Sequence, residues 1–98
     1  MRNKSREDLI RLAAEASGKD PFAAAVKDAT ENDFVSARFL KELLEGAGYE
    51  VKETPRNILT RVDVLKDGAQ IAYGESGDAA DALLQAALGY LRELPTTA

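Results

Sequence analysis

The stretch that decides the fold runs from Tyr49 to Tyr73 and reads YEVKETPRNILTRVDVLKDGAQIAY. Apolar and polar residues alternate over residues 49–54, which predicts a half-buried strand. The alternation is clearest over residues 58–66, the second predicted strand. Residues 69–73 return as a third strand, with Ile71 and Tyr73 on one face. The centre of the chain therefore predicts three strands in succession.

Two short connections separate these strands. Pro55-Arg-Asn57 predicts a turn or loop, and Asp67-Gly68 is a strong signal for a two-residue hairpin. Connections this short join only antiparallel neighbours, so the sheet is predicted to be a meander. The second strand then has two faces, one carrying Ile58, Thr60, Val62 and Val64, the other carrying Leu59, Arg61, Asp63 and Leu65.

Amphipathic helices are predicted on both sides of the sheet sequence. One runs from about Phe34 to Gly46, and another starts at the capping residue Asp78 and ends at Pro95. Gly74-Glu-Ser-Gly77 is predicted to break the sheet before that last helix. Both helices must bury an apolar stripe, and one face of the sheet is the available surface.

Two shorter helices are predicted at the N-terminus. The first begins at Ser5 as cap and stops at Gly18, and the second begins at Asp20-Pro21 and covers residues 22–29. The predicted fold is α+β, a three-stranded antiparallel meander packed by two helices (α-β-β-β-α) and preceded by two short N-terminal helices. The 98 residues fit one domain, with a helical extension over 1–32 and the core module over 33–94.

The composition narrows the function classes. The 13 basic and 17 acidic residues give a net charge of −4, whereas a duplex-binding domain is usually basic. Cys and His are both absent, which removes disulfides, thiolate sites and the commonest general base. No apolar run approaches the roughly 20 residues that span a bilayer, and the charged N-terminus lacks a signal segment. We therefore expect a cytoplasmic protein without catalytic residues, cofactor or metal.

The remaining chemistry-bearing residues have structural explanations. Asp78 and Asp81 lie at a helix start, where a cap and a favourable charge on the helix dipole account for them. Residues 74–77 lack the dinucleotide-binding spacing and stand among carboxylates that repel phosphate. Leu59 and Leu65 are more informative, because they share a strand face with Arg61 and Asp63. Either the first two helices cover that face, or it is a binding or dimer surface.

The module from Phe34 to Leu94 has the element order of the double-stranded-RNA-binding domain, and residues 72–91, AYGESGDAADALLQAALGYL, resemble that family's last strand and helix. The resemblance implies a similar fold. That family places lysines at the start of this helix to contact phosphates. Here Asp78, Ala79, Ala80 and Asp81 occupy the region, so RNA binding is not supported.

The chain also resembles small phage-encoded proteins of the phage ABA sandwich type. The resemblance is carried by residues 7–16, EDLIRLAAEA, by the short strands and by the alanine-rich final helix. It implies a phage or prophage accessory protein in a bacterial host cell. Small acidic proteins of this kind include inhibitors of bacterial defence complexes, such as anti-CRISPR proteins.

The leading hypothesis is a non-enzymatic, protein-binding inhibitor that occupies a basic or nucleic-acid-binding surface of its target. The predicted partner-binding residues are Leu59, Arg61, Asp63, Leu65, Asp78 and Asp81. One alternative is a nucleic-acid-binding module with the double-stranded-RNA-binding fold, using Lys52, Arg56 and Arg61. The other is a structural protein that forms a homodimer through the same sheet face.

Overall fold

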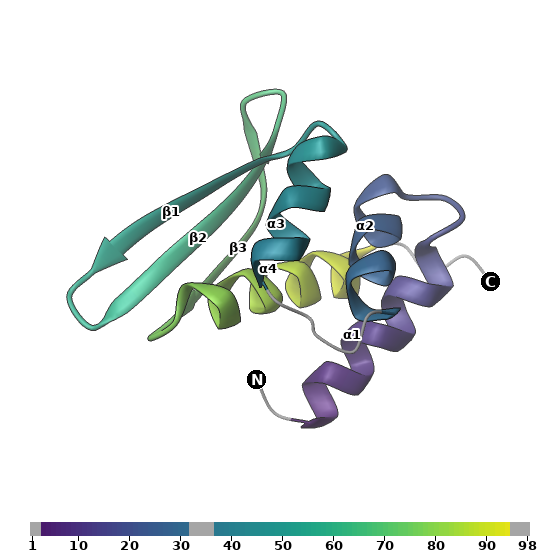
Figure 1. Ribbon diagram of the computed structural model, residues 1–98, viewed down its shortest axis with the longest axis horizontal. Helices are drawn as coiled ribbons and strands as arrows, with labels where there is room; N and C mark the ends of the chain where they lie inside the picture. The colour runs from purple at the N-terminus through teal and green to yellow at the C-terminus, as the bar shows by residue number, and fades with distance from the viewer. Residues whose placement is uncertain (1–2, 32–36, 95–98) are drawn as a thin grey trace.

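The protein has the predicted α+β fold, four helices and a three-stranded antiparallel sheet, in a computed structural model that describes residues 3–31 and 37–94 (Figure 1). The elements are α1 (Asn3–Ala16), α2 (Pro21–Glu31), α3 (Ala37–Gly46), β1 (Glu50–Arg56), β2 (Leu59–Lys66), β3 (Ala69–Ser76) and α4 (Ala79–Glu93). Within the described ranges, no helix is long and apolar enough to cross a membrane.

The sheet is the predicted meander, with the strand order β1-β2-β3. Asp67 and Gly68 form the second hairpin turn with φ angles of 53° and 82°, which confirms the prediction for this pair. The first turn is tighter than predicted, because Pro55 and Arg56 belong to β1. Asn57, with φ of 51°, lies in the remaining two-residue turn.

The helices α3 and α4 cover one face of this sheet, as predicted (Figure 1). Val62 and Val64 of β2 are buried there, as the alternation predicts. Ile58 was predicted to join them, but it lies in the turn and is 87% exposed. The helices cover the sheet only as far as the strand extends. Ile58 lies before the start of β2, so its apolar side chain stays exposed although it continues the alternation.

The residues of β3 that pack on α4 are small. Ala72 and Gly74 are buried against α4, whereas Tyr73 points away from the helices and is 58% exposed. Gly74 also continues the strand, which extends to Ser76 instead of breaking at residue 74. Small residues are needed on this face because a Cβ atom at Gly74 would lie 2.7 Å from the backbone nitrogen of Ala86 in α4.

The two N-terminal helices form part of the same hydrophobic core. Leu9 and Ala13 of α1 and Phe22 and Val26 of α2 are buried in one cluster with Val62 and the inner side chains of α4. The helix α1 packs against α2 and α4, and α2 packs against α1 and α3. The helices α1 and α2 therefore share one core with the sheet and with α3 and α4.

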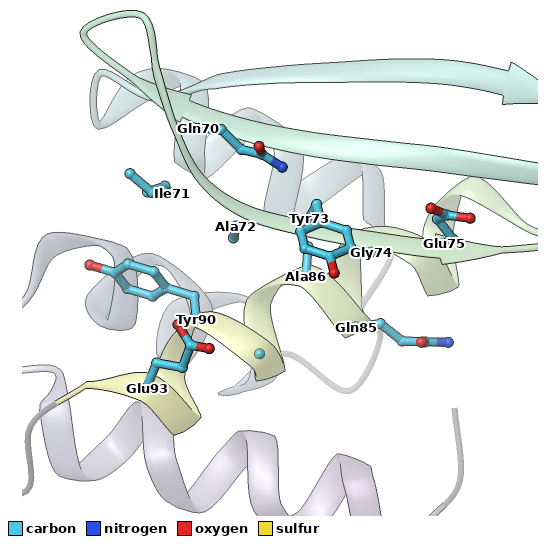
Figure 2. Close-up of a pocket in the computed structure, with 11 residues that line it drawn as sticks. Gln70, Ile71, Ala72, Tyr73, Gly74, Glu75, Gln85, Ala86, Tyr90 and Glu93 are labelled. Carbon is cyan, nitrogen blue, oxygen red and sulfur yellow. The ribbon is translucent and has the colours of Figure 1, made fainter.

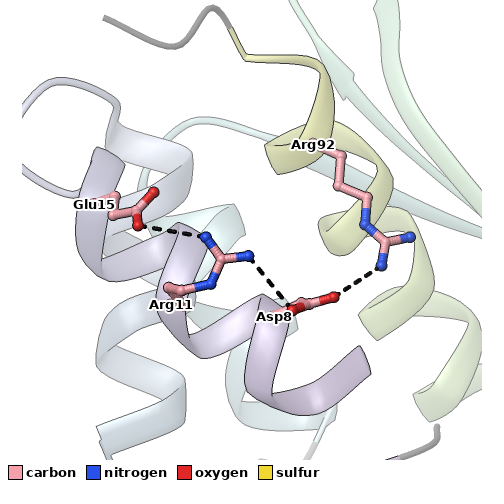
Figure 3. A network of polar contacts seen from close by, with 4 residues as sticks. All are labelled: Asp8, Arg11, Glu15 and Arg92. Atoms are coloured by element: carbon pink, nitrogen blue, oxygen red, sulfur yellow. Dashed lines mark hydrogen bonds and ion pairs between the residues drawn. The ribbon is translucent and has the colours of Figure 1, made fainter. Parts of the chain in front are cut away.

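Polar contacts join α1 to α4 at the surface of this core (Figure 3). Asp8 accepts hydrogen bonds from Arg92 of α4 at 3.2 Å and from Arg11 at 3.4 Å, and Arg11 also contacts Glu15 at 3.4 Å. The Arg92 guanidinium, with that of Arg11, holds the pKa of Asp8 below its usual range. The Asp8–Arg92 pair thus joins α1 to α4 at an exposed position.

The helix ends agree with the sequence signals in part. Asp20 caps α2 as predicted, because its Oδ1 accepts a hydrogen bond from the Phe22 nitrogen at 2.8 Å. Ser5 is not the cap of α1, since the helix already includes Asn3. The predicted helix start at residues 34–36 and the predicted stop at Pro95 lie outside the described residues.

Candidate interaction surface

The face of the sheet opposite α3 and α4 carries no helix of the described chain (Figure 1). We call it the outer sheet face. The strand register places the following residues on it: Glu50, Lys52, Thr54, Arg56, Leu59, Arg61, Asp63, Leu65, Gln70, Tyr73 and Glu75. The alternative that the N-terminal helices cover this face is wrong, because α1 and α2 pack among the helices.

Arg61 is the centre of the polar contacts on this face. Its Nε donates to Asp63 Oδ1 at 3.1 Å, and its Nη1 lies 3.4 Å from Glu75 Oε1 on β3. The guanidinium carbon lies 4.6 Å from the centre of the Tyr73 ring. Gln70 adds a hydrogen bond to Asp63 Oδ1 at 2.9 Å. Two carboxylates and an aromatic ring therefore hold the Arg61 side chain in one position.

Apolar side chains lie on both sides of this network. Leu59 is 40% exposed at one end of β2, and Leu65 is half-buried at the other end. Ile58 extends the apolar surface at the first hairpin turn. The structure thus brings together four of the predicted partner-binding residues, Leu59, Arg61, Asp63 and Leu65, on an uncovered surface.

Asp78 and Asp81 lie elsewhere, at the start of α4. Asp78 is the helix cap that the sequence predicts, and its Oδ1 accepts a hydrogen bond from the Ala80 nitrogen at 3.1 Å. Asp81 Oδ2 accepts hydrogen bonds from Ser76 at 2.8 Å and from Gln85 at 2.6 Å. Both carboxylates therefore stabilise the connection between β3 and α4. Asp78 remains exposed, whereas Asp81 is half-buried.

The charges of the outer sheet face balance. The positive side chains are Lys52, Arg56 and Arg61, and the negative ones are Glu50, Asp63 and Glu75. In the ranges that the structure describes, no group of three or more acidic side chains is placed to hold a metal ion. The surface offers ion pairs, hydrogen bonds and apolar contact, which is the chemistry of a macromolecular interface.

Tyr73 is the member of this face that sequence reasoning missed. The sequence placed it on one face with Ile71 but did not name it as a partner-binding residue, and the inward positions are Ala72 and Gly74. The signal lies in the small residues: Ala82 and Ala86 of α4, like Gly74, allow a close approach between helix and strand. Searches for matching protein families, curated proteins and solved structures found none for this chain.

Proposed function

We propose that this protein is a non-enzymatic interaction module that binds a protein partner through its outer sheet face. The observation that carries the proposal is Arg61, which is held over Tyr73 by Asp63 and Glu75 on a face that no described helix covers. Arg and Tyr are enriched among the residues that dominate binding energy at protein interfaces. An ordered arginine also loses less conformational freedom when the partner binds.

The balanced charge of this face supports a protein partner over nucleic acid. Nucleic-acid binding requires an excess of Lys and Arg against phosphates, and here the carboxylates of Asp63 and Glu75 are already paired with Arg61. At the start of α4, where the resembling RNA-binding family has lysines, this chain has the capping carboxylate of Asp78. We expect that adding the protein to duplex RNA at low salt does not change the mobility of the RNA in a gel.

The outer sheet face is tested by Arg61→Ala and Leu59→Asp. Truncation of a central interface residue costs about 2 kcal/mol or more, so we expect each variant to lose the protein that wild type captures from a bacterial lysate. Arg11→Ala on α1 removes an arginine that, like Arg61, pairs with two carboxylates, and this variant should capture the partner normally. Thermal unfolding checks that all variants fold. Equal capture by wild type, R61A and L59D would overturn the proposal.

A narrower hypothesis is an inhibitor that occupies a basic surface of a bacterial defence complex. Such an inhibitor must contact the basic surface with acidic side chains. Asp78 is the exposed acid to test, because Asp78→Asn removes the charge and keeps a good cap. We expect D78N to weaken binding to a basic partner while the melting temperature changes little. Unchanged affinity with Asp78→Asn would exclude this contribution of Asp78.

Self-association through the outer sheet face is the competing outcome. Exposed Ile58 and Leu59 at the first hairpin would then contact a second copy. Light scattering across protein concentrations distinguishes the two, since a protein-binding module is expected to stay monomeric alone. A dimer that Leu59→Asp dissociates would assign the face to self-association instead.

A further inference from the structure

A groove of about 560 Å³ runs along the free edge of β3, between this strand and the exposed side of α4 (Figure 2). The residues of β3 from Gln70 to Glu75 form one wall, and the other is formed by Gln85, Ala86, Gly89, Tyr90 and Glu93 of α4. The volume is in the range of clefts that hold ligands. It lies beside the outer sheet face and shares Gln70, Tyr73 and Glu75 with it.

The two edges of the sheet differ. β1 carries Pro55, which has no backbone N–H, and the exposed Lys52. Proline and lysine are features with which natural proteins prevent pairing at an edge strand. β3 has neither of these residues, and no strand in the described ranges pairs with its far side. The pairing of β3 with β2 is irregular at Ile71, so the regular edge that offers unpaired backbone groups to an added strand covers residues 72–76.

Gly89 gives independent support for an occupant. Glycine inside a helix costs about 1 kcal/mol relative to alanine. The packing of this chain does not explain it, because a Cβ atom at Gly89 would meet nothing within 4 Å. Gly74 on the opposite wall is different, since a Cβ there would collide with the backbone of α4. No contact within the described chain requires a glycine at position 89. The close approach of a ligand to α4 would explain why this position of the groove has no side chain.

The charge and shape of the groove define the ligand. Its charged lining residues are Glu75 and Glu93, and none of its lining residues is basic, but Glu75 already pairs with Arg61 of the outer sheet face. Glu93 has no ion pair with any residue that the structure describes. The ring of Tyr73 stands exposed above the edge and offers a face to a cation or an alkyl chain (Figure 2).

We propose that the groove binds an extended, basic peptide segment of another protein, which pairs with β3 as a fourth strand. Backbone hydrogen bonds to the edge supply affinity, and alternate side chains of the peptide reach Glu93 and Glu75. This goes beyond the proposed function, because Arg61 and Leu59 do not line the groove. The two sites still touch, because Arg61 contacts the groove residues Tyr73 and Glu75.

The probe is a displayed library of random eight-residue peptides, matched to the length of β3. We expect selection on wild type to enrich Lys and Arg at alternate positions. Hydrogen exchange should show that the selected peptide protects amides of β3. Gly89→Leu, which places a side chain in the groove without an internal clash, should weaken binding about tenfold or more, equivalent to about 1.4 kcal/mol.

Matched controls separate the groove from general effects. Ala14→Leu adds the same side chain to an exposed position of α1 and should leave peptide binding unchanged. Glu93→Lys should weaken binding more than Glu7→Lys, which makes the same charge change on α1. The selected peptide should bind Leu59→Asp normally, because Leu59 does not line the groove, so failure of the groove and failure of the outer sheet face are distinguishable.

Three results would overturn the inference. The first is a selection that yields no binder of the folded protein. The second is a binder whose affinity is the same for wild type and G89L. The third is concentration-dependent protection of β3 without peptide, which would assign the edge to a second copy of this chain.

Discussion

The carboxylate of Asp20 serves two elements at once. Its Oδ1 caps α2, while its Oδ2 accepts a hydrogen bond of 2.7 Å from the Tyr90 hydroxyl of α4. The Tyr90 ring packs on Phe22 with 4.3 Å between ring centres. Burial, together with the Asp20 carboxylate, raises the pKa of Tyr90 well above its ordinary value. One acidic residue thus links the start of α2 to the last turns of α4.

This contact predicts a dependence of stability on alkaline pH. The unfolded Tyr90 titrates near pH 10, whereas the folded one keeps its proton, so the unfolded state loses protons first as pH rises. The free energy of unfolding should therefore fall as pH rises above about 10. Tyr90→Phe should cost about 2 kcal/mol at neutral pH and show a weaker alkaline decline.

Urea unfolding of wild type and Y90F at a series of pH values measures this. The decline that remains in Y90F reports Tyr49, whose pKa burial also raises, with Asp20 contributing. Equal alkaline slopes for the two proteins would contradict the assignment to Tyr90. The sequence predicts the cap at Asp20-Pro21. It does not predict the contact between Asp20 and Tyr90, because the two residues are 70 positions apart and local patterns relate only near neighbours.

At the scale of elements, alternation predicts the strands and their outer face well. The face of Leu59, Arg61, Asp63 and Leu65 is where the alternation of β2 places it. The errors lie at strand ends and at close contacts. Pro55 extends β1 because an edge strand tolerates a missing N–H. The inward residues of β3, Ala72 and Gly74, were not predicted, because small residues carry a weak apolar signal.

The contact between β3 and α4 predicts unequal effects for two glycines. Gly74→Ala directs a methyl group at the backbone of Ala82 and Ala86, which cannot rotate away, so the helix must shift. We expect a loss of about 1–3 kcal/mol in the free energy of unfolding. Gly89→Ala in the same helix meets open space and should gain up to about 1 kcal/mol.

Chemical denaturation of both variants measures the difference. Equal stability of G74A and G89A would contradict this packing of α4 on β3. A shift of the helix in G74A would also show as faster hydrogen exchange in α4, because the buried face of that helix would loosen.

At the scale of the whole molecule, the position of α1 and α2 could not be derived from the chain order. Their stripes of apolar residues predict helices, and both the outer sheet face and the other helices were available to bury them. The structure places Leu9 and Phe22 in the core that Leu88 and Val62 also line. The outer sheet face is thereby left without a covering helix among the described residues, and this is the surface that we propose for the partner.

A shared core predicts that damage in α1 weakens the whole protein. Leu9 is buried and Ile10, its neighbour, is 41% exposed, so the two positions form a matched pair on one helix. Leu9→Ala should cost about 2–5 kcal/mol, whereas Ile10→Ala should stay within about 0.5 kcal/mol. If the protein unfolds as one cooperative unit, L9A melts at a lower temperature than wild type. The circular-dichroism signals of the helices and of the buried tyrosines must then be lost together at that temperature. In L9A, the helix signal could instead be lost first while the tyrosine signal keeps its wild-type midpoint. That result would show that α1 is a separate extension and that the rest of the core folds without it.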